Sequence, residues 1–359
     1  MTDASPGNDP RIPAVLASGG RPLQTPPRAF RLVAVSYPVD EDYDRINAEV
    51  LAGDAEIVST YALDDAQRTE VLRRAEALLA WDLPSEIPAG ALDQAAGLRL
   101  VQLLSAGVDA VDFTALPGRL IVASNAGAYS AAMSEHVLAM VLSLAKRLPQ
   151  RHAALVAGRY EKWAPARTLD GSVCVILGFG GIGIATARLM RAFGARVYAV
   201  TRSGETSEPA DFVGTLDDLD QVLAAADVLV VSLPLTLTTR GLIGQRELAL
   251  MKPDAILVNV ARGAIIDQAA LYEHLRAHPE FSAGIDTWWD EPAGDAPFRP
   301  DYPFVDLPNV IGSPHNSSIV PGTMLSGARA AAENVRRYLR GETLTGVIRR
   351  SDYVPQSGR

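Results

Sequence analysis

Residues 173–193 read VCVILGFGGIGIATARLMRAF, and this stretch decides the fold. An apolar run of strand length leads into Gly178-Phe-Gly180-Gly-Ile-Gly183, and the apolar period of a helix follows. Glycines at this spacing between a strand and a helix are typical of a dinucleotide-binding loop. Gly178 permits the tight turn, Gly180 lets the backbone approach a pyrophosphate, and Gly183 allows the helix to pack closely on the strand. The sequence therefore predicts a dinucleotide whose phosphates lie at the N-terminus of the helix.

Apolar runs alternate with stretches of helical period on both sides of this loop. Downstream, ARVYAV, ADVLVVSL, AILVNV, SAGID and NVIG are predicted buried strands. Upstream, RLVAV, a strand at 55–58, ALLAW and LRLVQLL are predicted strands, with helices near 41–51 and 64–76. Strands that alternate with helices indicate parallel sheets covered on both faces.

The predicted fold class is α/β, with two doubly wound parallel-sheet domains. A Rossmann cofactor domain at 125–316 is inserted into a flavodoxin-like substrate domain at 29–124 and 317–359. Residues 1–28 are rich in Pro, Gly, Ser and Asp and are predicted to be a flexible tail. A long apolar helix at 131–148, which should end at Pro149, connects the lobes, and a helix at 321–340 returns to the first lobe.

The residue after the strand RVYAV bears on the choice of cofactor. NAD enzymes usually carry Asp or Glu here to bind the ribose hydroxyls, whereas this chain has Thr201, followed by Arg202 and Ser203. A guanidinium with hydroxyls binds a 2′-phosphate that a carboxylate would repel. We therefore expect NADP to be preferred, with NAD also possible. In the alternative interpretation, Arg202 is a solvated loop residue that stacks on adenine, and cofactor choice is loose.

Polar side chains follow three predicted strands at the edge where open α/β sheets bind ligands. Arg262 follows AILVNV, Asp286, Asp290 and Glu291 follow SAGI, and His315 follows NVIG. His315 is the best acid or base among the five histidines. The alternative for His315 is a packing or capping role. His274 and His278 have an i, i+4 spacing that suits a metal, but no HExxH pattern accompanies them, so a solvated helix end is favoured and no metal is expected.

Composition excludes several classes of partner. Lys and Arg number 33 against 42 Asp and Glu, which gives a net charge of -9. This charge provides no positive electrostatic field that would attract nucleic acid or an anionic membrane. The apolar run at 137–145 is far shorter than the ~20 residues of a membrane-spanning helix. One cysteine and a polar start without a signal-peptide pattern lead us to expect a reducing cytoplasm.

The chain resembles the D-isomer-specific 2-hydroxyacid dehydrogenase family, which includes glyoxylate/hydroxypyruvate reductases, D-lactate dehydrogenases and phosphoglycerate dehydrogenases. The resemblance extends from about Leu98 to Val347. Its motifs are LLSAGVDAVDF, NAGAYSAAMSEHVLAMVLSLAKR, LGFGGIG, LPLTLTTRGLIG, MKPDAILVNVARGAIID, GIDTWWDEP and SPHNSS.

The resemblance implies roles for particular residues. Arg262, Glu291 and His315 take the catalytic positions, and Asp286 lies near the nicotinamide carboxamide. The backbone at Ser105, Ala106 and Gly107, with Arg262 and His315, faces the substrate. The implied cofactor-binding set is Gly178, Gly180, Gly181, Ile182, Gly183, Thr201, Arg202, Ser203, Leu233, Pro234, Thr239, Val260, Ala261 and Asp286.

The chemistry of a 2-oxo acid reduction explains these residue types. Hydride adds to the carbonyl carbon and a proton to its oxygen, so protonated His315 serves as the donor. A neighbouring carboxylate, Glu291 in preference to Asp290, favours the imidazolium and orients the ring. Arg262 offers a planar fork that holds the substrate carboxylate and polarises the carbonyl. The formate dehydrogenases of the superfamily pair this histidine with Gln, so Glu291 argues against that branch.

Alternatives from other classes remain open at this stage. The same fold serves cofactor-sensing transcriptional corepressors, and a third possibility is oxidation of phosphite or another small oxyanion. Trp288 and Trp289 depart from the usual family pattern and indicate either an apolar wall for a larger substrate or packing between the lobes. The apolar helix at 131–148 indicates a homodimer, since helices at this place in the family pack across a two-fold axis. The sequence does not name the substrate side chain.

Overall fold

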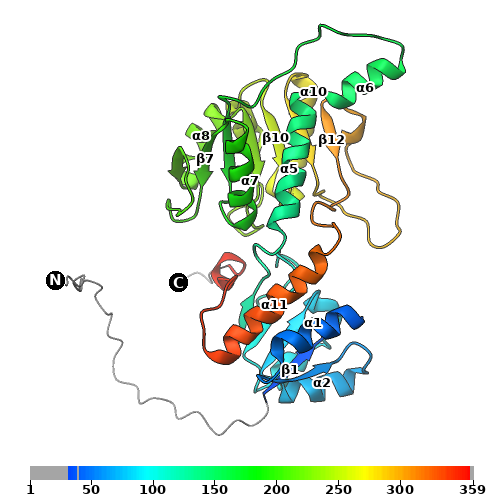
Figure 1. Ribbon diagram of the computed structural model, residues 1–359, viewed down its shortest axis with the longest axis vertical. Coiled ribbons are helices and arrows are strands. Elements are labelled where there is room, and N and C mark those ends of the chain that lie inside the picture. The colour runs from blue at the N-terminus through cyan, green and yellow to red at the C-terminus, as the bar shows by residue number, and fades with distance from the viewer. Residues whose placement is uncertain (1–30, 39, 356–359) are drawn as a thin grey trace, which may run out of the picture.

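The computed structural model describes residues 31–38 and 40–355, and the predicted tail at 1–28 lies outside them. In this part of the chain the strands form two parallel sheets, one above the other in Figure 1. The first sheet has the order β2-β1-β3-β4-β5. Its strands are β1 (Leu32–Val35), β2 (Glu56–Ser59), β3 (Ala77–Ala80), β4 (Leu100–Leu103) and β5 (Ile121–Ala123).

Helices cover both faces of this first sheet. They are α1 (Glu41–Leu51), α2 (Asp65–Arg74), α3 (Leu83–Glu86), α4 (Ala91–Gln94) and, from the far end of the chain, α11 (Thr323–Arg340). The α1 helix begins at Asp40, whose carboxylate accepts hydrogen bonds from the amides of Asp42 and Tyr43. The α11 helix packs on α1, β3 and β4, which confirms that it returns to the first sheet.

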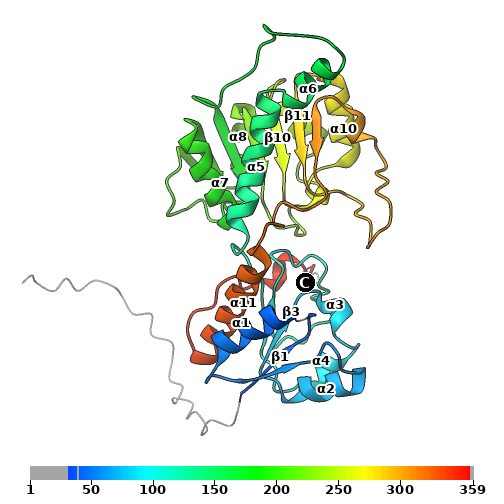
Figure 2. The same ribbon diagram turned by 45° about the vertical axis from the view of Figure 1, so that its right-hand side comes forward.

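The second sheet has seven strands in the order β12-β11-β10-β9-β6-β7-β8. They are β6 (Val173–Leu177), β7 (Arg196–Val200), β8 (Phe212–Gly214), β9 (Val228–Val231), β10 (Ile256–Asn259), β11 (Ser282–Ile285) and β12 (Val310–Gly312). Helices α5 (Ser130–Ala145) and α7 (Gly181–Ala192) cover one face, and α8 (Leu219–Ala225), α9 (Gln245–Leu250) and α10 (Gln268–Ala277) cover the other (Figure 2). The α/β class with two doubly wound sheets is confirmed.

The connecting helix differs from the prediction. It ends at Ala145, and the chain turns at Arg147, which has a φ of 52°. A separate helix, α6 (Leu148–Val156), then begins, with Pro149 in its first turn. Proline is favoured there because the first helical amides have no partner within the helix, so Pro149 starts the second helix and does not end the first.

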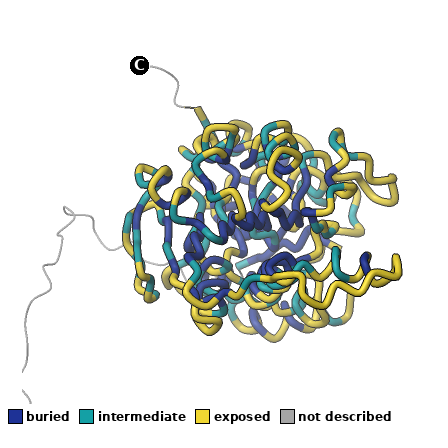
Figure 3. Tube along the Cα trace, turned by 90° about the horizontal axis from the view of Figure 1, so that it is seen from above, coloured by how far each residue is buried: buried dark blue, intermediate teal, exposed yellow. Residues whose placement is uncertain are grey.

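Burial follows the layers, with the strands and the inner helix faces dark in Figure 3 and the outer loops exposed. Each sheet has apolar clusters on both faces. Val33 and Val35 face α1 and α11, whereas Leu32 and Ala34 face the opposite side. This alternation is the period of two that strands require. In the described part of the chain, no helix is long and apolar enough to cross a membrane.

Candidate active site

The carboxyl ends of the strands of both sheets border a cavity of about 360 Å³. From the first sheet come residues of the loop after β4, namely 106–109, and from the second come the glycine loop and the residues after β9 and β10. Residues 346–349, 352 and 353, near the C-terminal end of the described residues, close another side. This is the edge at which ligands bind in open α/β sheets.

The glycine loop has the conformation that its sequence predicts. Gly178 has a φ of +92°, and a Cβ added there would lie 2.7 Å from the Ser232 backbone. A Cβ at Gly183 would overlap the carbonyl oxygen of Gly178, so helix and strand pack as closely as glycine allows. A Cβ at Gly180 would meet nothing within 4 Å, which leaves the space beside the first amides of α7 open. The loop therefore fits a pyrophosphate.

A second cavity, of about 490 Å³, continues from the glycine loop past the end of β7. Thr201, Arg202, Leu233, Pro234 and Thr239 line it. The Thr201 hydroxyl is buried and has no hydrogen-bond partner among the described residues. An unpartnered hydroxyl beside an arginine fits the sugar end of a dinucleotide. Asp217 also lines this cavity, and the Arg202 guanidinium pairs with the Asp352 carboxylate at 2.7 Å.

Arg262 lies at the end of β10 and reaches across to the first sheet. Its Nε donates to both oxygens of Asp109, at 3.0 and 3.1 Å, and its Nη1 donates to the Ala261 carbonyl at 2.7 Å. A Cβ at Gly107 would overlap Nη2, so only glycine leaves room for the guanidinium. The buried Asn259 side chain braces this turn, since it donates to the Arg262 carbonyl and accepts from the Ala261 amide. The result is a half-buried guanidinium whose Nη2 lies over the Gly107 backbone.

His315 and Glu291 form the pair predicted from the sequence. The Nδ1 of His315 lies 2.7 Å from Oε2 of Glu291, and the other carboxylate oxygen accepts from the Trp288 amide at 3.0 Å. Burial alone would raise the pKa of Glu291. The hydrogen bonds from His315 and Trp288, with the charges of His315 and Arg262, outweigh burial and lower the pKa below its usual value. Glu291 is therefore an anion that orients the His315 ring.

The loop of His315 is held by Asp286. His315 has a φ of 50°, a left-handed conformation that is strained for a side chain of this size. Its amide donates to the Asp286 carbonyl at 2.8 Å. The fully buried Asp286 carboxylate accepts from the Asn316 amide, the Ser317 amide and the Ser313 hydroxyl, the last at 2.5 Å. These bonds fix the backbone on both sides of His315.

The predicted residues divide into two groups by position. Those that line the two cavities are Ala106, Gly107, Gly178, Gly180, Gly181, Ile182, Gly183, Thr201, Arg202, Leu233, Pro234, Thr239, Val260, Ala261 and Arg262. Those outside both linings are Ser105, Ser203, Asp286, Glu291 and His315. Ser105 braces its own loop, because its hydroxyl donates to the Gly107 carbonyl at 2.8 Å.

Three residues at the site were not given a role by the sequence reasoning. Asp109, Asp352 and Tyr353 line the cavity, and Asp109 and Asp352 pair with Arg262 and Arg202. Asp109 lies in the loop after β4 that also carries Ser105, Ala106 and Gly107, so the motif LLSAGVDAVDF marked the loop but not this residue. Asp352 follows no strand or helix pattern, so no sequence signal marked it.

The positions of Trp288 and Trp289 show that neither interpretation from the sequence is right: they form no wall of the substrate cavity, and they do not pack between the lobes. Trp288 packs edge-on against Phe298, and Trp289 stacks on Phe304 at 5.2 Å, within a cluster of the second sheet. Their indole N–H groups donate to the carbonyls of Ser313 and Ile266. Neither lines the cavity between the sheets. They are core residues that fix the segment leading to Glu291.

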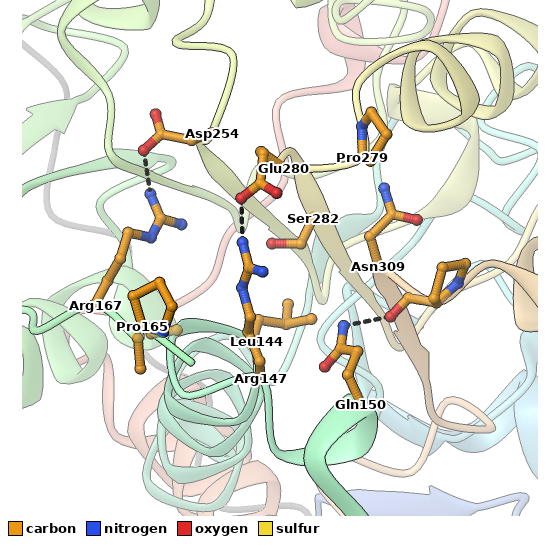
Figure 4. Close-up of a pocket in the computed structure, with 13 residues that line it drawn as sticks. Leu144, Arg147, Gln150, Pro165, Arg167, Asp254, Pro279, Glu280, Ser282 and Asn309 are labelled. Carbon is orange, nitrogen blue, oxygen red and sulfur yellow. Dashed lines mark hydrogen bonds and ion pairs between the residues drawn. The ribbon is translucent and has the colours of Figure 1, made fainter. Parts of the chain in front are cut away.

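A further cavity, of about 440 Å³, lies at the opposite edge of the second sheet (Figure 4). Its lining includes Asp254, Ser282 and Asn309, which stand just before or at the start of strands, and the turn between α5 and α6. Ion pairs of Arg147 with Glu280 and of Arg167 with Asp254 cross it. Because it is at the amino ends of the strands, it is not the candidate site. No three His, Cys, Asp or Glu side chains of residues 31–38 and 40–355 form a metal-binding group.

Comparison with known proteins identifies the family. Residues 138–317 match the family described as D-isomer specific 2-hydroxyacid dehydrogenase, NAD binding domain. A glyoxylate reductase of Aeropyrum pernix is 33% identical over 287 residues, which cover 77% of this chain and 84% of that protein. This chain belongs to the D-isomer specific 2-hydroxyacid dehydrogenase family. The resemblance drawn from the motifs is therefore confirmed.

Other members of the family match this chain over different shares of their length. A D-3-phosphoglycerate dehydrogenase of Methanocaldococcus jannaschii is 30% identical over 328 residues, and the chain covers only 60% of its length. The solved structure of a D-isomer specific 2-hydroxyacid dehydrogenase from Xanthobacter autotrophicus Py2, in complex with NADPH and MES, has a TM-score of 0.74 at 28% identity. The match covers 90% of this chain and all of that one. The family and its nicotinamide-binding domain are common to these proteins, whereas their substrates differ.

Proposed function

We propose that this chain is an NADP(H)-preferring oxidoreductase that transfers hydride between the cofactor and a small 2-oxo or 2-hydroxy acid, in the manner of a glyoxylate/hydroxypyruvate reductase. The observation that carries the proposal is the hydrogen-bonded pair of His315 and Glu291, 2.7 Å apart, in the lobe that also holds the glycine loop and Arg262. An acid with its own carboxylate partner and an arginine at strand ends is the set that 2-oxo acid reduction requires.

Each residue has a distinct role in this proposal. The bound cofactor supplies or accepts the hydride. Protonated His315 donates a proton to the carbonyl oxygen, and Glu291 orients the ring. With Nε held by Asp109 and Nη1 by Ala261, the Nη2 group of Arg262 is left to bind the substrate carboxylate beside the Gly107 backbone.

The proposed preference for NADP rests on the residues that follow β7. Thr201 places a hydroxyl, and no carboxylate, where NAD enzymes bind the ribose, and Arg202 and Ser203 follow it. The unpartnered Thr201 hydroxyl and the Arg202 guanidinium both line the cavity beyond the glycine loop. The Xanthobacter relative was solved with NADPH, which agrees with the proposal.

We also propose the organisation predicted from the sequence. The first sheet and α11 belong to a substrate domain at 29–124 and 317–359, and the second sheet belongs to a cofactor domain at 125–316. The protein acts as a homodimer. Apolar side chains exposed around α6 support this, since single chains seldom expose a group of large apolar side chains.

A panel of 2-oxo acids assayed with NADPH and with NADH tests the function. We expect turnover, with a higher kcat/KM for NADPH. His315→Gln should lower kcat by about 10²–10⁴-fold and leave NADPH binding nearly intact. A His315→Gln variant close to the unmutated rate would overturn the mechanism. Cofactor binding without turnover of any 2-oxo acid would favour a cofactor-sensing binding protein, and turnover of phosphite alone would favour an oxyanion dehydrogenase.

A further inference from the structure

The segment that follows α11 crosses from the first sheet to the second, and both views place it between them (Figures 1 and 2). Val347 pairs with Ala123 at the edge of the first sheet, and Arg350 donates to three carbonyls, of Leu116, Pro117 and Leu120. Tyr353 stacks on Phe113, with ring centroids 4.9 Å apart. We refer to residues 346–353 as the C-terminal strap.

The strap reaches the cofactor side through Asp352. Its carbonyl accepts from the Leu237 amide at 3.0 Å, and its carboxylate pairs with Nη2 of Arg202 at 2.7 Å. Arg202 lines both cavities, and Asp352 lines the cavity of about 360 Å³ between the sheets. The arginine proposed to bind the 2′-phosphate is therefore already paired with a carboxylate from the other end of the chain.

The Arg202–Asp352 pair should affect the binding of NADP and the binding of NAD differently. A 2′-phosphate is an anion that needs the Arg202 guanidinium and is repelled by a carboxylate on the same group. A ribose 2′-hydroxyl is neutral, so it neither needs that charge nor displaces Asp352. Binding of NADP, but not of NAD, therefore places a second anion beside the Asp352 carboxylate on the Arg202 guanidinium.

We propose that Asp352 is a cofactor-selectivity residue, which limits the preference for NADP by occupying Arg202 from the C-terminal strap. The proposal rests on the proposed function, because it takes Arg202 as the 2′-phosphate ligand. Since Arg202 is more than half exposed, the effect is that of a surface ion pair, about two- to five-fold in affinity.

Calorimetric titration of the full chain with adenosine 2′,5′-bisphosphate and with 5′-AMP tests the proposal without catalysis. Asp352→Asn keeps the shape of the side chain and the carbonyl bond to Leu237. We expect it to tighten the bisphosphate about two- to five-fold and to leave 5′-AMP unchanged. Added salt should reduce the gain. Glu205→Gln is the control, because it removes the same charge from an exposed position near Arg202.

A double variant separates this inference from the proposed function. When Arg202 is already alanine, Asp352→Asn should no longer tighten the bisphosphate. If Arg202→Ala weakens the bisphosphate but Asp352→Asn does not change it, the selectivity role is wrong and the NADP preference stands. If Arg202→Ala has no effect, the NADP preference itself is wrong. A loss of 5′-AMP affinity in Asp352→Asn would mean that Asp352 binds the ribose, which also overturns the proposal.

Discussion

The His315–Glu291 pair leads to a kinetic prediction. Glu291→Gln removes the carboxylate that accepts from His315 and orients its ring, so the proton donor should be held less well against the carbonyl oxygen. We expect kcat for 2-oxo acid reduction to fall about 10-fold or more, with the affinity for NADPH unchanged. Asp290→Asn is the matched control, because this neighbouring carboxylate is not the partner of His315. A kcat of Glu291→Gln equal to that of the unmutated protein would contradict the pairing.

Arg262 should affect binding and rate together. Arg262→Lys keeps the charge but cannot bond Asp109, the Ala261 carbonyl and a substrate carboxylate with one planar group. We expect KM for the 2-oxo acid to rise and kcat to fall, with kcat/KM down about 10- to 100-fold. Steady-state kinetics with saturating NADPH measures both. Arg196→Lys, at the exposed amino end of β7, should change neither; a change in KM alone for Arg262→Lys would limit Arg262 to ground-state binding.

Individual site residues differed in how far sequence predicts them. Arg262, Glu291 and His315 follow apolar strands, and parallel strands bring their carboxyl ends to one edge of the sheet. Local sequence patterns were therefore sufficient to place these three residues at that edge. Asp109 and Asp352 pair with arginines 153 and 150 residues away. These pairs depend on how the two lobes meet, and no local sequence pattern predicts that arrangement.

At the scale of elements, α10 carries a stability prediction. The rings of His274 and His278 stack at 4.2 Å near the end of this helix, and Phe281 packs edge-on against His274. Burial, with the charge of His278 as a smaller cause, lowers the pKa of His274 from 6.5 to about 4. Between these values the unfolded chain takes up a proton at His274 that the folded chain does not.

The free energy of unfolding should therefore decrease as pH falls from about 6.5 to about 4. His274→Gln removes the group, so urea titrations across this range should give a weaker dependence of the unfolding free energy on pH. The test compares the slope of the unfolding free energy against pH, so a change in the absolute stability of the variant does not affect it. His152→Gln, an exposed histidine of α6, should leave the slope unchanged. Equal slopes for His274→Gln and the unmutated protein would exclude this assignment.

Elements with a clear apolar period were predicted well, and several short ones were not. The helix at 41–51 and the strands at 173–177 and 196–200 have the predicted bounds. Strands β5 and β8 have three residues each and were not predicted, whereas β12, also of three residues, was predicted from the apolar run NVIG. Pro149 was interpreted as a stop although proline is equally suited to a first turn, so two helices were predicted as one.

At the scale of the whole molecule, the two lobes meet through specific contacts. Arg262 with Asp109 and Arg202 with Asp352 join the second sheet to the loop after β4 and to the C-terminal strap. Each pair includes a residue proposed to bind substrate or cofactor. We therefore expect ligand binding to be coupled to the contacts between the lobes, because each ligand would share its guanidinium with one of these pairs.

The homodimer is the last prediction. Helix α6 and the segment after it extend over the top of the second sheet in Figure 1, and they expose Leu155, Val156, Tyr160 and Trp163 at 58, 77, 81 and 86%. Exposure of four large apolar side chains is unfavourable in water, and a two-fold contact would bury two copies of them. Light scattering at micromolar concentration should give about twice the 38.2 kDa of one chain.

Replacing Val156 and Trp163 together by Glu should convert the protein to monomers, because the charges would be buried without partners in a two-fold contact. Tyr61→Glu is the control, since Tyr61 is 50% exposed but lies on the other lobe, and this variant should remain dimeric. A circular dichroism melt of each variant separates dissociation from unfolding. A 38.2 kDa species alone for the unmutated chain would exclude the dimer. A dimer that survives both glutamates would place the contact elsewhere, and the apolar side chains of the α6 segment would need another partner.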